Sequence, residues 1–211
     1  MDKKRFAYFL KLSLLCVLAV ALNFLLNNFC VYYVKFPLFL DTVFNAAVTF
    51  AAGLIPGLVT ALLSYVALNS WAIGFYPFVL CSIVEVLLIW RLMPANQDKR
   101  HAELAALPSA KMFFFIRVFA RLMVLYIVCS LTISVLGGVI DYFHYTVLSN
   151  PKRSFSAEDT FKIGLLRSGM PVLAIDILSR VPVNIVDRFI VIFGGYFISS
   201  ALTHTKIVCQ H

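Results

Sequence analysis

The chain has 211 residues, of which 62% are hydrophobic and 13% charged, and its mean hydropathy is +0.92. Soluble domains carry about 25% charged residues, so this composition excludes an ordinary soluble protein. It predicts a single integral membrane domain over residues 1–211, an all-α helical bundle that crosses the cell membrane about six times. The net charge of +8 comes from lysines and arginines scattered among apolar spans and loops, which indicates topology and lipid headgroups as partners, not nucleic acid.

The first predicted span covers residues 6–29 and follows three basic residues at positions 3–5. A basic cluster before a first span favours a cytoplasmic N-terminus by the positive-inside rule. Ala19-Val20-Ala21 is also compatible with a signal-peptide cleavage site. However, the apolar run continues beyond the length of a typical signal core, so we expect a retained first helix.

A membrane hairpin is predicted over residues 36–70, in which Gly53-Leu54-Ile55-Pro56-Gly57 joins two apolar helices. Glycine commonly ends a helix and proline commonly begins one. Each arm is about long enough to cross a ~30 Å hydrocarbon core. These residues therefore predict the second and third spans of a multi-pass protein.

The first arm of this hairpin carries a polar face. Asp41, Asn45 and Thr49 recur every four residues and therefore share one side of a helix. Polar groups at membrane depth must contact protein or a water-filled cavity. Ala47 and Ala51 provide a small-residue surface on which a neighbouring helix can pack.

Three more spans are predicted, over residues 75–92, 112–139 and 181–202. The total of six is an even number, so the C-terminus is expected on the same side as the N-terminus, in the cytoplasm. The polar segment 93–111 is then the main inner loop, and segment 141–180 lies outside. Within that outer segment, residues 163–178 are apolar but interrupted by charged residues and a proline. This pattern favours a surface-lying or re-entrant helix over a seventh span.

A ligand site is predicted near the outer membrane surface. With a rise of about 1.5 Å per residue, Asp41 and Asn45 reach depths similar to those of Asn184, Asp187 and Arg188. We expect these side chains to line a pocket in which Arg188 binds a carboxylate or phosphate, because a guanidinium can grip such groups bidentately. The alternative is a structural clamp that holds two helices together.

A second charged group lies nearer the cytoplasm. Glu85 in the fourth span and Arg121 in the fifth lie at similar depth, and Arg117 lies one turn away from Arg121. These residues predict a buried ion pair of Glu85 with Arg117 or Arg121. The alternative role for this group is docking of a partner protein.

Catalytic motifs are absent from the sequence. There is no HExxH, GxSxG, Walker A or paired acidic motif. The five cysteines show no CxxC and no Cys/His ligand spacing. We therefore expect neither an enzyme nor a protein with a bound metal or cofactor.

Two stretches, GLIPGLVTALLS and PVNIVDRFIVIFGGYFISSAL, together with the six-helix layout, resemble the substrate-binding S components of energy-coupling factor (ECF) transporters. The resemblance implies binding of a vitamin or trace nutrient, a transmembrane coupling subunit and two ATPase subunits. Family members dock through small residues of their first helix, whereas Ala47 and Ala51 lie here in the second. The competing prediction is a membrane sensor input or interaction module without transport activity.

Overall fold

The computed structural model describes residues 3–34, 40–69, 77–93, 108–148, 157–167 and 169–204. The regular elements within these ranges are all helical, which confirms the predicted all-α bundle. The helices are α1 (Lys3–Phe29), α2 (Val43–Ala52), α3 (Leu54–Asn69), α4 (Val79–Leu92), α6 (Pro108–Asp141), α7 (Ala157–Leu166), α8 (Val172–Phe189) and α9 (Gly195–His204). A 3₁₀ turn, Leu40–Thr42, precedes α2, and π-helical segments extend α1, α6 and α8 as Cys30–Val34, Tyr142–Val147 and Ile190–Gly194.

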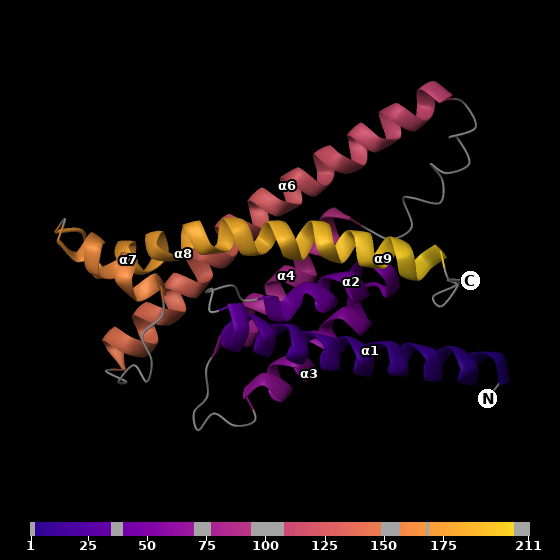
Figure 1. Cartoon of the computed structure of the whole chain (residues 1–211), viewed down its shortest axis with the longest axis horizontal. Coiled ribbons are helices and arrows are strands. Elements are labelled where there is room, and N and C mark those ends of the chain that lie inside the picture. Colours follow the sequence, from indigo (N-terminus) through magenta and orange to yellow (C-terminus); the bar gives the residue numbers. More distant parts are fainter. Residues whose placement is uncertain are drawn as a thin grey trace.

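Three of the described helices are long and apolar enough to cross a membrane, namely Phe6–Phe29, Met112–Val147 and Val172–Thr203. Leu40–Ala52 and Leu54–Leu68 are shorter apolar helices. Figure 1 shows that α1 begins and α9 ends at the same end of the molecule, whereas α6 ends and α8 begins at the opposite end. The composition and lengths of these helices are those of a membrane protein.

The hairpin between α2 and α3 turns within a single residue. Gly53 has a φ of +91° and donates its N–H to the carbonyl of Thr49 at 3.0 Å, which ends α2. Helix α3 begins at the next residue, with Pro56 in its first turn. A Cβ at Gly57 would lie 2.2 Å from Oγ1 of Thr49, so this glycine allows the two arms to pack in close contact.

The small-residue face of α2 is packed inside the protein. Ala47 and Ala51 are 1% and 3% exposed, and α2 packs against α9. A Cβ at Gly195 of α9 would lie 3.1 Å from the backbone nitrogen of Ala47. Helix α9 therefore packs on this face, as expected of a small-residue surface, and the two alanines are not exposed.

The last long helix begins earlier than predicted. The expected single helix over residues 163–178 is instead divided, because α7 ends at Leu166 and α8 begins at Val172. Gly169, with a φ of +73°, and Pro171 lie in the connection. The last span is predicted to begin at residue 181, whereas Pro182 lies inside α8, so residues 172–180 belong to the last long helix and extend it.

Helices α6 and α8 approach each other through glycine. A Cβ at Gly138 would lie 2.6 Å from Cα of Ile177, and a Cβ at Gly137 would lie 3.0 Å from Nη1 of Arg180. Small residues are the usual means by which membrane helices bring their backbones together. This contact places Arg180 and the residues after it along the face of α6.

We predict that Gly138→Ala destabilises the protein by about 1 to 3 kcal/mol, the usual cost of overpacking. The nearest atoms belong to the backbone of Ile177, which cannot rotate away. Gly164→Ala in α7 is the matched control, because its added methyl meets nothing within 4 Å and alanine favours a helix by about 0.5 to 1 kcal/mol. Thermal unfolding in detergent measures both, and equal melting of Gly138→Ala and wild type would contradict the close approach.

Candidate functional site

A cavity of about 220 Å³ lies among α2, α3, α4, α6 and α8. Typical small-molecule pockets measure about 300 to 1,000 Å³, so this volume suits a small solute. The wall combines charged groups with amides, hydroxyls and apolar side chains. Its charged residues are Asp41, Arg180 and Arg188, its uncharged polar residues include Asn45, Ser64, Ser82 and Asn184, and its aromatic residues are Tyr65 and Phe78.

Four of the residues predicted for the ligand site line this cavity. Asp41 and Asn45 reach it from the start of α2, and Asn184 and Arg188 reach it from successive turns of α8. Asp187, the fifth, is completely buried and binds Arg188 instead of lining the cavity. Sequence spacing thus placed the two helix faces correctly, although residues of α3, α4 and α6 also contribute to the wall.

Arg188 is buried, and its guanidinium binds side chains of the protein. Its Nη1 forms an ion pair with Oε2 of Glu85 and donates to Oγ1 of Thr42 at 3.1 Å. Its Nη2 donates to Oδ2 of Asp187 at 2.6 Å. Nε has no hydrogen-bond partner among the described residues. Arg188 therefore links α8 to α4 and to the turn before α2.

Glu85 has a different partner from the one expected. It is 1% exposed and pairs with Arg188 of α8, not with Arg117 or Arg121 of α6. The side chain of Arg117 is exposed. Depth along the membrane normal matched Glu85 to Arg121, but depth does not determine which face of a helix a side chain occupies. The face of α4 that carries Glu85 is turned toward α8.

An amide network joins the first three helices beside the cavity. Nδ2 of Asn23 in α1 donates to Oδ1 of Asn45 at 2.9 Å and to Oγ of Ser64 at 3.0 Å. Oδ1 of Asn23 accepts the backbone N–H of Phe44 at 3.0 Å, near the start of α2. Sequence reasoning missed Asn23, which is 0% exposed. The available signal was an amide within an apolar span, since such groups need partners inside the protein.

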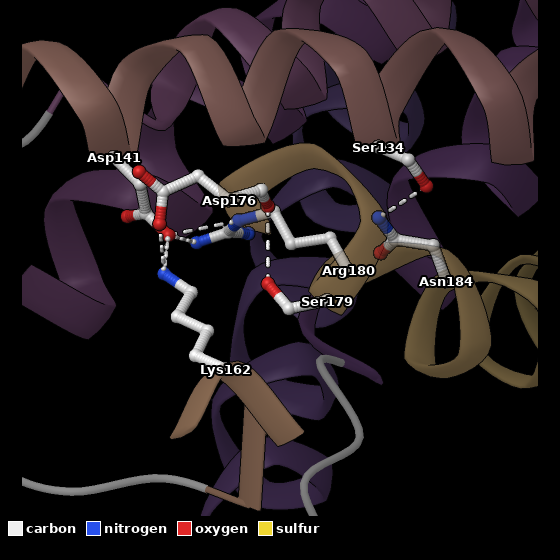
Figure 2. Close-up of polar contacts among 7 residues, drawn as sticks. All are labelled: Ser134, Asp141, Lys162, Asp176, Ser179, Arg180 and Asn184. Carbon is white, nitrogen blue, oxygen red and sulfur yellow. Dashed lines mark hydrogen bonds and ion pairs between the residues drawn. The ribbon is translucent and has the colours of Figure 1, made fainter. Parts of the chain in front are cut away.

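Asn184 of α8 is held in place by a hydrogen bond to α6. Figure 2 shows its Nδ2 turned toward Oγ of Ser134 in α6, with the two atoms 3.0 Å apart. Ser134 in turn donates to the carbonyl of Ser130 at 2.7 Å. Within the described part of the chain, Oδ1 of Asn184 receives no hydrogen bond. The side-chain amide of Asn184 is therefore held in place at the cavity wall, and its oxygen can still accept a hydrogen bond.

A second charged cluster holds α7, α6 and α8 together (Figure 2). Oδ2 of Asp141 accepts Nε and Nη2 of Arg180 at 3.0 and 2.8 Å, and Nζ of Lys162 at 3.1 Å. Lys162 also pairs with Oδ1 of Asp176 at 2.7 Å. The guanidinium of Arg180 lies 5.0 Å from the ring centroid of Phe78, within the range of a cation–π contact.

Sequence reasoning also missed this cluster, because it treated residues 141–180 as an outer segment. The available signal was the pair Asp176 and Arg180, four residues apart in a helix. Lys162 and Asp141 come from other elements, so their approach depends on how α6, α7 and α8 pack.

Comparison of the chain with protein-family models, curated proteins and solved structures finds no match. The fold and the cavity nevertheless define a class, an all-α membrane-type bundle with a polar pocket among its helices. Described side chains include no group of three or more His, Cys, Asp and Glu residues that could hold a metal ion. What the site can do must therefore be inferred from its own geometry.

Proposed function

We propose that this protein is a solute-binding membrane subunit of an importer for a small polar nutrient. The observation that carries the proposal is the cavity of about 220 Å³. Its wall combines the polar residues Asp41, Asn45 and Asn184 with the aromatic residues Tyr65 and Phe78. Small-molecule sites usually combine apolar walls with a few fixed polar groups. The amides are held by Asn23, Ser64 and Ser134, so the pocket exists before any ligand enters.

The proposed partners are a transmembrane coupling subunit and two ATPase subunits of an ECF-type system. The resemblance of the hairpin and last-span stretches to S components supports this assembly, and the sequence carries no Walker A motif of its own. We further propose a multi-pass arrangement with both termini in the cytoplasm. The common end at which α1 begins and α9 ends supports an even number of crossings (Figure 1).

Mass spectrometry of small molecules that co-purify with the protein from cells in rich medium tests this function. We expect one solute to accompany the wild type. Ser82→Phe should lose it, because the phenyl ring would occupy the cavity that Ser82 lines. Ser13→Phe is the matched control, since Ser13 is exposed on α1 and its substitution leaves the pocket unchanged.

Uptake of the identified solute by intact cells separates an importer from a sensor. An importer of the proposed kind requires ATP, so accumulation should stop when cellular ATP is depleted. Binding without ATP-dependent accumulation would instead support the alternative, a membrane sensor input or interaction module. Retention of the same solute by wild type and Ser82→Phe would show that the cavity is not its binding site.

A further inference from the structure

The cavity contains a carboxylate, Asp41, that shares the charge of one guanidinium with two other carboxylates. Asp41 lines the cavity, and no described cation lies within ion-pair distance of it. The guanidinium of Arg188 is paired with Glu85 and Asp187. Its single positive charge faces Asp41 as well, so one guanidinium cannot balance all three carboxylates.

Arg180, the other arginine of the cavity wall, is also paired with an acidic side chain. Arg180 donates twice to Asp141, and the surrounding group of Asp141, Asp176, Lys162 and Arg180 contains equal numbers of acids and bases. This group thus adds no net positive charge to balance Asp41. A carboxylate facing an apolar bundle is costly unless something pairs with it.

We propose, on the basis of the proposed solute-binding function, that the pocket takes a small organic cation whose protonated nitrogen pairs with Asp41. The same nitrogen can donate to Oδ1 of Asn184, which receives no hydrogen bond from the described residues. Tyr65 and Phe78 provide aromatic walls for the organic part, and ring faces attract cations. An anion would instead add a further negative charge to a site where three carboxylates already share the guanidinium of Arg188.

An organic cation fits these groups better than a metal ion does. Metal ions require several hard oxygen ligands or a cluster of Asp, Glu, His and Cys. The described residues include no group of three or more such side chains that could hold one. A single carboxylate, one amide oxygen and aromatic walls are instead the recognition set of a protonated amine.

Thermal unfolding with three ligands of one shape tests the proposal. Benzylamine, benzyl alcohol and benzoate are similar in size and differ in charge, and sodium chloride at equal ionic strength controls for a monovalent metal ion. We expect benzylamine to raise the melting temperature most, because a ligand that binds only the folded state stabilises it. Equal or greater stabilisation by benzyl alcohol, benzoate or sodium would overturn the organic-cation assignment.

Asp41→Asn provides the decisive variant. It should weaken benzylamine binding about 30-fold or more, the effect expected from losing one partner of a buried charge pair. Without ligand, the variant should melt at the same temperature as wild type or higher, because the substitution removes one of three carboxylates that share a single guanidinium. Ser13→Ala on α1, which is exposed and is not one of the cavity-lining residues, is the control and should keep normal binding.

The outcomes separate this inference from the proposed function. Unchanged benzylamine binding in Asp41→Asn, or a lower melting temperature of that variant without ligand, would overturn the role of Asp41. If a neutral or anionic solute co-purifies and Ser82→Phe abolishes its binding, the solute-binding function stands and only the charge assignment fails. If benzylamine, benzyl alcohol and benzoate all leave the melting temperature unchanged and no solute co-purifies, both proposals fail.

Discussion

Replacing Arg188 with methionine should lower the free energy of unfolding by about 3 to 5 kcal/mol, the cost of removing one partner from a buried ion pair. Glu85 and Asp187 would remain buried without the guanidinium that links them. Arg188→Lys should recover only part of this loss, because one ammonium cannot reproduce the fork that contacts Glu85, Asp187 and Thr42. Thermal unfolding in detergent measures all three proteins.

Two further variants determine whether this loss reflects the ion pair. Arg117→Met removes an exposed arginine and should leave stability nearly unchanged. In the double variant Glu85→Leu/Arg188→Met, stability should recover relative to Arg188→Met, because apolar residues often replace a buried pair without loss. If the stability losses of the single variants Glu85→Leu and Arg188→Met add up to the loss of the double variant, the two side chains are not energetically coupled.

Neutralising Asp141 should weaken the attachment of α7 to the rest of the bundle, because Lys162 would keep only its ion pair with Asp176. Asp141→Asn removes the charge that accepts three donors from Lys162 and Arg180, and we expect a loss of about 3 kcal/mol. Because Lys162 is the charged side chain by which α7 joins the cluster, hydrogen exchange over Ala157–Leu166 should accelerate before global unfolding. Exchange unchanged in this helix would contradict its attachment through Asp141.

Lys162→Met is the comparison for this variant. It removes the two ion pairs of Lys162 but leaves Asp141 paired with Arg180. We therefore expect accelerated exchange in α7 with a smaller loss of global stability than in Asp141→Asn. Equal global losses in the two variants would mean that Arg180 contributes nothing to the cluster.

The pH dependence of this attachment follows from Lys162. Burial lowers the pKa of Lys162, but the hydrogen bond with Asp176 and the charges of Asp141 and Asp176 outweigh it and raise the pKa above 10.5. A raised pKa means that the stabilisation from the lysine is complete below 10.5 and is lost as pH rises through the folded-state value. Titration of Lys162 should thus leave α7 attached throughout the neutral range.

Local patterns in the sequence predicted much of the fold. Gly53 and Pro56 specify the hairpin because their backbone preferences act locally, and the four-residue spacing of Asp41 and Asn45 identified one wall of the cavity. The partner of Glu85 could not be obtained in this way, because depth leaves the rotation of α4 undetermined. The extension of α8 past Pro182 depends on packing against α6, which overrides the local tendency of proline to begin a helix.

The cavity also depends on residues that are synthesised far apart in time. Arg188 follows Glu85 by 103 positions and Thr42 by 146. At about 5 to 20 residues per second, the ribosome takes roughly 5 to 20 s to reach Arg188 after Glu85. During this interval Glu85 lacks the cation that pairs with it in the folded protein. We therefore expect a nascent chain that is arrested between α4 and α8 to be cleaved by proteases faster than the complete chain.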